Sequence, residues 1–338
     1  MIDKKNYSLK AHNTFGIDAQ CDRFIEYSSV SELQQFLADR PVNVPLLSIG
    51  QGSNILFTRD FHGIVLHSAI KGINLIASDS DTVLVEAGAG EVWDDFVSTC
   101  IERGYYGIEN LSLIPGEVGA SAIQNIGAYG VEAKDCIEAV TAIDIEHNRI
   151  VILDKTHCRY AYRSSRFKTD WKGRYIITHV LYRLHKTFQP NLEYGALKRE
   201  LSERNLNVLT AQTLREVIID IRRSKLPDPK QIGSAGSFFM NPIISSEQFE
   251  LLRPLYPDMP HYDMGNNRVK VPAGWMIEQL GWKGRRVGCV GVYSKQALVI
   301  VNYGGASGDD VARLSQRIQQ DVQKHFGIEI KPEVIWIG

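Results

Sequence analysis

The stretch LIPGEVGASAIQNIGAYG, residues 113–130, is the part of this 338-residue chain that says most about its fold. It holds four glycines, one proline and a single charged side chain, Glu117. A backbone with so few side chains can approach a large flat ligand closely or direct its N–H groups at an anion. A glycine-rich connection between sheet elements explains the composition equally well. The chain contains neither G-x-G-x-x-G nor G-x-x-x-x-G-K-[ST], so neither a Rossmann fingerprint nor a P-loop accounts for the stretch.

The composition is that of an ordinary globular protein, with 44% hydrophobic and 23% charged residues, and the length allows two or three domains. A formal net charge of −1 gives no electrostatic footprint for nucleic acid or a membrane. The five cysteines form no C-x-x-C pair, so we expect reduced thiols and no metal site. The N-terminal sequence MIDKKNYSLK lacks the apolar segment of a signal peptide, and no apolar run is long enough to span a membrane. We therefore expect a cytoplasmic protein.

The first 190 residues predict many strands and few helices. Ser29-x-x-Glu32 is a capping box that opens a helix to about residue 39, and an amphipathic pattern predicts a second helix over 91–103. The predicted strands are 24–27, 45–49 (buried), 64–67, 82–87, 175–184, and a hairpin of 139–146 with 149–153. This order lacks the regular βαβ alternation of a Rossmann domain.

The pattern changes near residue 212. Thr213-x-x-Glu216 predicts the start of a helix, and 226–230 is an extended breaker before a second small-residue run, 233–242. Further helices are expected at 273–280 and 309–326, and strands at 296–302 and 328–337.

Three clusters could carry chemistry. Residues 158–168 interleave cations and hydroxyls with aromatic rings and could bind a carboxylate or phosphate, although a solvated basic turn has the same pattern. Lys225, Ser237 and Asn241 flank glycines, and without G-x-S-x-G or a His–Asp pair a hydrolase nucleophile is a poor interpretation. A serine could act as an acid only toward a strongly basic carbanion or enolate. Glu333 falls within the predicted C-terminal strand, where a buried carboxylate is either ion-paired scaffolding or a working acid.

Eight short motifs occur in an order and spacing that resemble the UDP-N-acetylenolpyruvoylglucosamine reductase (MurB) family over almost the whole chain. They are Asn13-Thr14-Phe15-Gly16, Ile49-Gly-Gln-Gly-Ser-Asn54, Ile114-Pro-Gly116, Ile123-Gln-Asn-Ile-Gly-Ala-Tyr-Gly130, Tyr162-Arg163-Ser164, Gly236-Ser-Phe-Phe239, Asn241-Pro242 and Pro332-Glu-Val334.

The resemblance implies an α+β chain with a two-subdomain, PCMH-type (vanillyl-alcohol-oxidase-like) FAD-binding fold and a C-terminal α+β substrate domain. The implied divisions are 1–69 for the first FAD subdomain, to which a strand in 328–338 returns, 70–211 for the second, and 212–327 for the substrate domain. FAD would lie between the subdomains against glycine-rich loops. The implied FAD contacts are Gly50, Gln51, Gly52, Ser53, Asn54, Ile114, Pro115, Gly116, Gly119, Ser121, Asn125, Ile126 and Gly127.

In the family, NADPH reduces the flavin and leaves, and the enolpyruvyl UDP-sugar then takes its place. Hydride passes from flavin N5 to the β-carbon of the enol ether. Arg163 and Glu333 match the residues that stabilise the enolate, and Ser237 matches the serine that protonates it. To help rather than repel, Glu333 would have to be protonated or share a proton. The matched substrate contacts are Tyr129, Tyr194, Lys225, Asn241, Tyr262, Lys283 and Gln296.

Tyr262 matches a tyrosine of the loop that covers the diphosphate in type I members, so the resemblance implies a type I enzyme and a monomer. Two positions depart from a relative of the family. Ala120 stands where that relative has a serine near the flavin, so one hydrogen bond to the cofactor would be missing, and Ile335 stands where it has an arginine.

Two other functions remain open on the sequence alone. An oxygen-using flavin oxidase of a sugar or alcohol would keep the fold and need no NADPH. A non-catalytic nucleotide-binding protein would bind a UDP-sugar without flavin. The combination of Arg163, Ser237 and Glu333 suits an enolate and therefore favours the reductase.

Overall fold

The computed structural model describes residues 1–204 and 208–338. Contacts divide the chain into two compact units, each assembled from separate segments. Unit 1 comprises Met1–Tyr7, Cys21–Gln51 and His62–Arg222, and unit 2 comprises Ser8–Gln20, Gly52–Phe61 and Arg223–Gly338. Within the described residues, the cysteines are free and all but Cys289 are buried.

A four-stranded sheet forms one part of unit 1. Its strand order is β1 (Ile2–Ser8), β2 (Gln20–Tyr27), β5 (Phe61–Ser68) and β3 (Leu46–Ile49), with β3 parallel to β5. Helix α1 (Val30–Asp39) begins where the Ser29 hydroxyl accepts a hydrogen bond from the Glu32 N–H at 3.1 Å. The helix buries Leu33, Phe36 and Leu37 against strand residues of the same hydrophobic cluster, which stabilises both elements.

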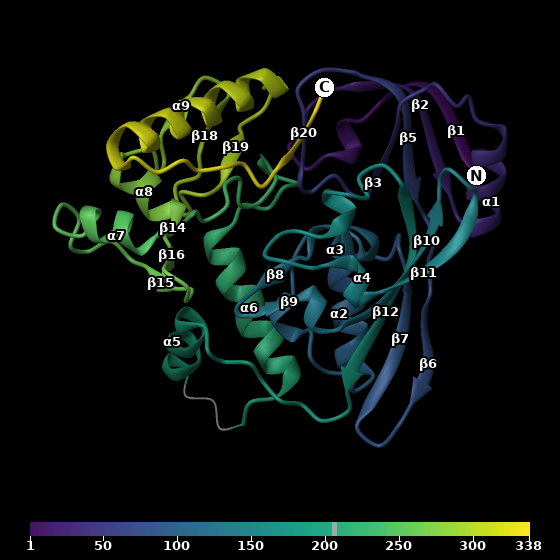
Figure 1. The fold of residues 1–338 in the computed structure, drawn as a ribbon, viewed down its shortest axis with the longest axis horizontal. Helices are drawn as coiled ribbons and strands as arrows, with labels where there is room; N and C mark the ends of the chain where they lie inside the picture. Colours follow the sequence, from purple (N-terminus) through teal and green to yellow (C-terminus); the bar gives the residue numbers. More distant parts are fainter. Residues whose placement is uncertain (205–207) are drawn as a thin grey trace. The chain divides into compact units, whose positions relative to one another are not determined.

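A five-stranded antiparallel sheet forms the larger part of unit 1. Its strand order is β11 (Arg149–Asp154), β10 (Ile137–Asp144), β12 (Tyr175–His185), β7 (Thr82–Gly88) and β6 (Ile73–Ser78). Helices α2 (Trp93–Glu102) and α3 (Val118–Gln124) pack on this sheet (Figure 1). Their apolar side chains share a core with alternate strand residues, as the Phe96 and Tyr182 rings show with centroids 4.8 Å apart.

Two further helices and several short elements complete unit 1. Helices α5 (Gly195–Glu203) and α6 (Ala211–Lys225), whose last three residues are assigned to unit 2, share a third apolar cluster that includes Leu197, Leu214 and Ile218. The remaining elements are β8 (Gly127–Ala128), β9 (Val131–Glu132), α4 (Lys155–Cys158) and the 3₁₀ turns Glu109–Leu111, Ala133–Asp135 and Arg166–Lys168.

Unit 2 contains short sheets and three helices. One sheet has the order β13 (Gly233–Ser234), β19 (Ile300–Asn302), β18 (Val290–Val292) and β17 (Arg286–Val287), and another has β14 (Ile243–Ser245), β16 (Arg268–Lys270) and β15 (Tyr262–Asp263). The C-terminal β20 (Ile335–Ile337) pairs in parallel with β4 (Ile55–Phe57). The helices are α7 (Ser246–Leu252), α8 (Ala273–Gln279) and α9 (Gly308–Phe326), and a 3₁₀ turn spans Lys10–His12.

Most expected elements are confirmed, and the errors concern boundaries and burial. Helix α6 begins at Ala211, and the Thr210 hydroxyl rather than Thr213 accepts the bond that caps it. Of the strands expected at 296–302 and 328–337, only Ile300–Asn302 and Ile335–Ile337 form. Strand β3 is mostly half-exposed or exposed rather than buried.

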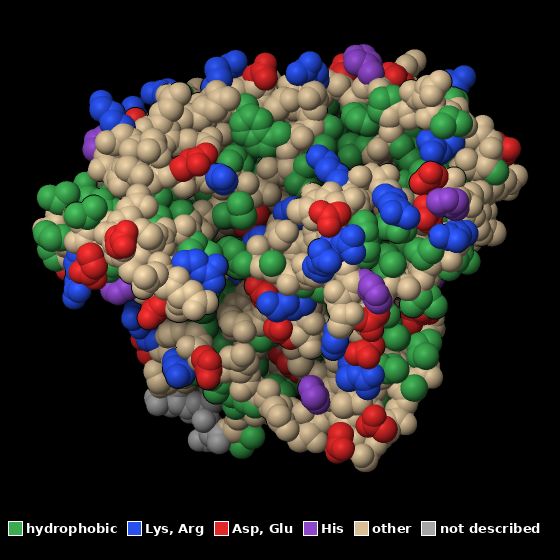
Figure 2. Space-filling view, in the orientation of Figure 1, with side chains coloured by type: hydrophobic (Ala, Val, Ile, Leu, Met, Phe, Trp, Pro, Cys, Tyr) green, Lys and Arg blue, Asp and Glu red, His purple; other side chains and the backbone are tan. Residues whose placement is uncertain are grey.

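The surface mixes charges of both signs. On the face drawn in Figure 2, lysine and arginine side chains alternate with aspartate and glutamate, as expected for a net charge of −1. Among the described residues, no helix is both long enough and apolar enough to cross a membrane.

Candidate active site

Leu113 opens the glycine-rich stretch in a left-handed backbone conformation, with φ of +56°. This conformation is costly for a leucine, so the surrounding structure must hold it. The Leu113 N–H donates to Asp94, and its carbonyl oxygen accepts from the Arg222 Nε at 3.1 Å. Asp94 is itself held by Arg215 through two bonds of 2.6 and 3.0 Å. Burial alone would raise the pKa of Asp94, but the bonds from Arg215 and Leu113 lower it.

The middle of residues 113–130 is a short helix rather than a continuous loop. In α3, Gly119 lies so close to Ala89 that a Cβ on it would stand 2.9 Å from the Ala89 Cβ. The Ser121 hydroxyl is buried and lies 2.8 Å from the Tyr182 hydroxyl. Asn125 ends the helix at φ +47°, and its side chain donates to Glu132 and to the Ala161 carbonyl. The side chains of Ser121 and Asn125 are therefore hydrogen-bonded within unit 1.

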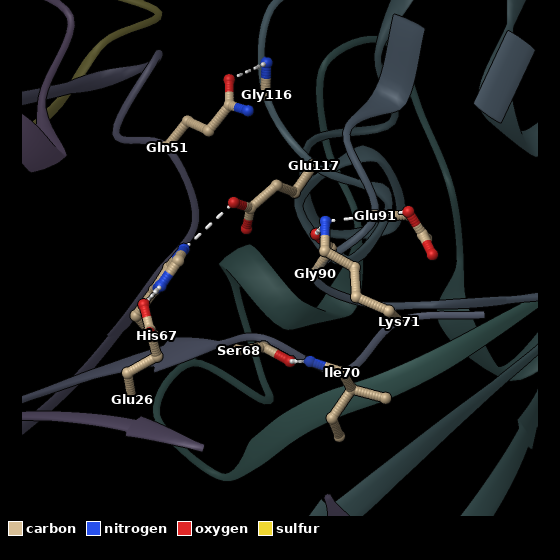
Figure 3. A network of polar contacts seen from close by, with 10 residues as sticks. All are labelled: Glu26, Gln51, His67, Ser68, Ile70, Lys71, Gly90, Glu91, Gly116 and Glu117. Atoms are coloured by element: carbon tan, nitrogen blue, oxygen red, sulfur yellow. Dashed lines mark hydrogen bonds and ion pairs between the residues drawn. The ribbon is translucent and has the colours of Figure 1, made fainter. Parts of the chain in front are cut away.

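Gly50, Gln51, Gly116 and Glu117 join two glycine-rich segments of unit 1. The Gly116 N–H donates to the Gln51 Oε1 at 3.2 Å (Figure 3). A Cβ on Gly50 would stand 2.9 Å from the Glu117 Oε2, so any larger residue there would have to displace the carboxylate. Gly116, at φ +121°, requires glycine.

Gly52 is a glycine for a different reason. Its φ is +65°, and a Cβ on it would stand 2.1 Å from the His12 carbonyl oxygen. In the same unit, the Thr14 N–H donates to the Gly52 carbonyl at 3.3 Å, and the Asn54 Nδ2 donates to the Glu333 carbonyl at 3.3 Å. The predicted flavin loop at 52–54 is thus tied to the 12–14 and 333 segments of unit 2.

The residues of unit 1 fit a flat, partly apolar ligand such as a flavin. Ile114, Ile126 and Gly127 are half-exposed and Pro115 is exposed, whereas the adjoining Gly116 and Asn125 are buried. The bonds to Leu113 and Gly116 fix the backbone that carries these surfaces. Accessible apolar residues and a glycine on a backbone fixed by these bonds allow a flat ligand to approach closely.

Arg163 joins the basic cluster 158–168 to the glycine-rich stretch 113–130. It sits in a tight turn in which Ala161 and Ser164 exchange backbone hydrogen bonds of 2.9 and 3.0 Å, and its own φ is +53°. Its Nη2 donates to the Gly127 carbonyl at 2.6 Å. A Cβ on Gly127 would stand 3.1 Å from the Arg163 Nη1, so the glycine makes room for the guanidinium. The basic cluster 158–168 is thereby anchored on the stretch 113–130 within unit 1.

Ser237 and Glu333 lie on adjacent segments of unit 2. The Glu333 N–H donates to the Phe238 carbonyl at 2.8 Å, and the Met240 N–H donates to the Lys331 carbonyl at 2.9 Å. Phe238 and Phe239 are buried and anchor the first segment, whereas Ser237 is exposed. Glu333 is half-exposed and precedes β20, so the expectation of a buried strand at this position is wrong.

The predicted substrate residues divide between the units. In unit 1, the rings of Tyr129 and Tyr194 meet edge to face with centroids 5.4 Å apart. Burial raises the pKa of the Tyr129 phenol, although Arg222 opposes the shift. Tyr129 also has a positive φ, of +48°.

In unit 2, most of the predicted substrate residues have local partners. The Asn241 Oδ1 accepts from the Ala273 N–H at 3.0 Å at the start of α8, and the Gln296 Oε1 accepts from the Leu298 N–H at 3.3 Å. Lys283 pairs with Glu278 at 2.8 Å. Tyr262 is exposed with the Lys270 ammonium 5.4 Å from its ring centre, and Lys225 is exposed at the end of α6.

Sequence reasoning missed the residues that hold these loops in place. Asp94, Arg215 and Arg222 clamp Leu113, and His67 binds Glu117. Only Glu117 carried a signal, as the single charge in residues 113–130. The others lie in ordinary amphipathic or alternating patterns, where a partner far along the chain leaves no trace.

Comparison with known proteins identifies the family. Residues 22–154 match the sequence model of an FAD binding domain, and residues 228–337 match that of the C-terminal domain of UDP-N-acetylenolpyruvoylglucosamine reductase. The chain is 52% identical over 334 residues to the UDP-N-acetylenolpyruvoylglucosamine reductase of Bacteroides fragilis, covering 99% of this chain and 100% of the relative. The chain belongs to the UDP-N-acetylenolpyruvoylglucosamine reductase family.

Other members of the family match over nearly the same length. The reductase of Porphyromonas gingivalis is 49% identical, covering 99% of each chain, and that of Pseudomonas aeruginosa is 46% identical, covering 98% of this chain and 97% of the relative. The crystal structure of the MurB reductase from Thermus caldophilus shares the fold, with a TM-score of 0.70 at 21% identity over the full length of both chains.

These matches confirm the family resemblance, the fold class and the cofactor. As a member of the reductase family, the protein is an FAD-dependent oxidoreductase with a PCMH-type FAD-binding fold. The absence of a Rossmann fingerprint is explained, because this fold holds its flavin on other loops.

Proposed function

We propose that this protein reduces the enolpyruvyl group of UDP-N-acetylglucosamine-enolpyruvate to give UDP-N-acetylmuramate, with NADPH as the electron source. The observation that carries the proposal is the 52% identity over 99% of the chain to a reductase named for this substrate. The reaction would belong to peptidoglycan precursor synthesis in the cytoplasm, with the enzyme acting as a monomer.

Bound FAD would supply the redox chemistry, accepting a hydride from NADPH and delivering it from N5 to the β-carbon of the enol ether. The residues of the chain would stabilise the negative charge that hydride transfer creates. Negative charge develops on the neighbouring carbon and spreads into the carboxylate, where fixed hydrogen-bond donors stabilise the transition state most. Arg163 is assigned to this role, and its bond to the Gly127 carbonyl supports the assignment because it fixes the guanidinium.

Ser237 is assigned as the proton donor. A hydroxyl is a weak acid, so it can serve only where the base is as strong as an enolate carbon. Its exposed position next to two buried phenylalanines supports this role, because the hydroxyl is accessible while its backbone is anchored. Glu333 is assigned to stabilise the enolate, which requires that it be protonated or share a proton.

The UDP-sugar contacts follow from the family and form part of the same proposal. Tyr129 and Tyr194 offer an edge-to-face aromatic pair, and Lys225 and Lys283 offer positive charge for a diphosphate. Asn241 and Gln296 would contribute amide groups, and Tyr262 its exposed ring.

An anaerobic titration of the holoprotein, followed by flavin absorbance, tests the proposal. NADPH should bleach the flavin, and the enolpyruvyl UDP-sugar should then restore its colour. Bleaching without restoration would leave the family fold in place and overturn the substrate. Oxygen consumption with a hydroxylated substrate and no NADPH would identify an oxidase instead. A protein that binds UDP-sugar but no FAD would contradict the enzyme altogether.

A further inference from the structure

His67, on strand β5, lies between two carboxylates. Its Nδ1 is 2.8 Å from the Glu26 Oε2, and its Nε2 is 3.0 Å from the Glu117 Oε1 (Figure 3). The side chains of His67 and Glu117 are only 15% and 7% exposed. An ionised carboxylate can only accept hydrogen bonds, so the imidazole must carry a proton on both nitrogens to bind both groups. The geometry therefore describes a largely buried imidazolium held by two anions.

The surroundings of His67 favour its charged form. The ring of Phe24, on β2, lies nearly parallel to the imidazole with centroids 6.3 Å apart. Tyr27 is the other titratable group of β2 near this network, and burial raises the pKa of its phenol, so it stays neutral. After the strand, Lys71 pairs with Glu91 at 3.7 Å. Burial alone would lower the pKa of His67, but the bonds and charges of Glu117 and Glu26 raise it.

The Glu117 end of this network reaches the predicted flavin loops. The Glu117 carboxylate packs directly on the Gly50 backbone, where a Cβ would stand 2.9 Å from Oε2. One residue away on each segment, the Gly116 N–H donates to Gln51. The segments 50–51 and 116–117 are thus held together at two points, and His67 fixes one of them.

We propose that the His67 imidazolium is a positioning residue for FAD, holding Glu117 against Gly50 so that the cofactor binds weakly once His67 loses its proton. The proposal rests on the proposed function in taking residues 50–54 and 113–130 as flavin loops. Deprotonation would remove the positive charge between the two carboxylates and leave at most one donor for both, so Glu117 would be held less tightly even where the remaining N–H faces it. Glu117 would then move away from Gly50 more readily, and the Gly116–Gln51 bond alone would hold the two segments together there.

The direction of the pH effect follows from the geometry, because only an imidazole protonated on both nitrogens can donate to both Glu26 and Glu117. A group whose folded-state pKa lies above its ordinary value, here 6.5, contributes its full stabilisation below that value. The contribution is lost as the pH rises through the raised pKa. We therefore expect FAD to bind most tightly in mild acid and to weaken toward alkaline pH.

The test measures FAD release from full-length holoprotein. Wild type, His67→Asn, Glu117→Gln and the control His62→Asn would be diluted at several values from about pH 6 to about pH 9, and released FAD measured by its fluorescence. His62 lies on the same strand, 3.3 Å from Asp22, but its side chain is 83% exposed. Titration of FAD itself affects every variant equally, so differences between variants report on the protein. Thermal unfolding of each variant would run in parallel.

We expect the dissociation constant for FAD to rise at least about tenfold across this pH range in wild type and in His62→Asn. The reason is that a hydrogen bond to a charged group contributes enough free energy to change an affinity by about that factor. His67→Asn should bind FAD about tenfold more weakly at pH 6 with a flat profile. In Glu117→Gln an amide can bond to a neutral imidazole, so its profile should also flatten. A purely structural His67 would lower the unfolding temperature without changing the shape of the pH profile.

A wild-type profile that is flat, or one that His67→Asn and Glu117→Gln both leave unchanged, would overturn the proposal. If His67→Asn does not fold, the Glu117→Gln and wild-type profiles still decide it. Failure of the proposed function looks different, since wild type would then bind no FAD, or would bind FAD that the enolpyruvyl UDP-sugar cannot reoxidise.

Discussion

The backbone N–H of Glu333 donates a hydrogen bond to the carbonyl oxygen of Phe238 at 2.8 Å. This bond fixes the spacing between the Glu333 segment and the residue that follows Ser237, although the two are far apart in the sequence. An isolated bridge between Phe239 and Pro332 continues the contact. The predicted proton donor and one predicted enolate stabiliser therefore share a rigid support in unit 2.

Replacing Ser237 with alanine should separate the two half-reactions. Reduction of the flavin by NADPH needs no protein proton donor and should proceed at the wild-type rate. Reoxidation by the enolpyruvyl UDP-sugar should slow by about 10²- to 10⁴-fold, the usual contribution of a positioned acid. Rapid-mixing absorbance would measure both rates, with the exposed Ser294→Ala of the same unit as control. Equal losses in both steps would contradict the proton-donor role.

Replacing Arg163 with lysine should slow reoxidation by about 10²-fold while sparing reduction by NADPH. Lysine keeps the charge but lacks the planar fork that can bind the Gly127 carbonyl and a substrate carboxylate together. Arg166→Lys is the matched control, because Arg166 belongs to the same cluster but stacks on Trp171, 4.2 Å from its ring centre. A normal reoxidation rate in Arg163→Lys would remove Arg163 from the proposed charge stabilisation.

Replacing Gly52 with alanine should destabilise the protein, and not only weaken FAD binding. The new Cβ would meet the His12 carbonyl at 2.1 Å in a left-handed conformation, and overpacking with this strain costs about 3 kcal/mol of unfolding free energy. Gly16→Ala is the control, since Gly16 has φ +67° with no atom near its Cβ and should cost only about 1 kcal/mol. Denaturant unfolding would measure the unfolding free energy of both variants. Equal losses would show that the clash with the His12 carbonyl adds nothing to the cost of the left-handed conformation.

Replacing Arg215 with methionine should lower the unfolding free energy by about 3 kcal/mol near neutral pH, because it leaves the Asp94 carboxylate without its ion pair. The pKa of Asp94 is lowered from 3.8 in the folded protein. The ionised Asp94 therefore stabilises the fold above pH 3.8, and this stabilisation is lost as the pH falls through the folded-state pKa. The difference in unfolding free energy between wild type and Arg215→Met should therefore become smaller in acid. Denaturant unfolding at several pH values would measure it. A gap that stays constant with pH would mean that packing of the arginine stem, not the ion pair, causes the loss.

The exposed pair Arg253–Glu250 provides the control for that experiment. Both side chains are more than 60% exposed, at 63% and 61%, so Arg253→Met should change the unfolding free energy by less than about 0.5 kcal/mol. An equal loss of unfolding free energy in Arg215→Met and Arg253→Met would show that burial does not make the Asp94 ion pair more stabilising than an exposed one.

The sequence by itself determined the elements whose signal is local. The hairpin of β10 and β11 follows from alternation, and the helix α9 from its apolar period and the closing Gly327, each readable within one segment. The ordered motifs likewise determined the family, since they depend on residue identity and spacing alone. Local patterns failed where burial decided the outcome, as in residues 328–337, of which only the last few form a strand because their pairing partner is β4.

Only the tertiary structure decided which distant residues meet. Arg163 on the Gly127 carbonyl, His67 between Glu26 and Glu117, and Asp94 on the Leu113 N–H join residues from separate elements. No periodicity records such pairs, because each depends on which faces of two elements become buried against each other. Gly50 and Gly52 are a further example. Residues 50 and 52 look alike in the sequence, but packing assigns the first to the Glu117 carboxylate and the second to the His12 backbone.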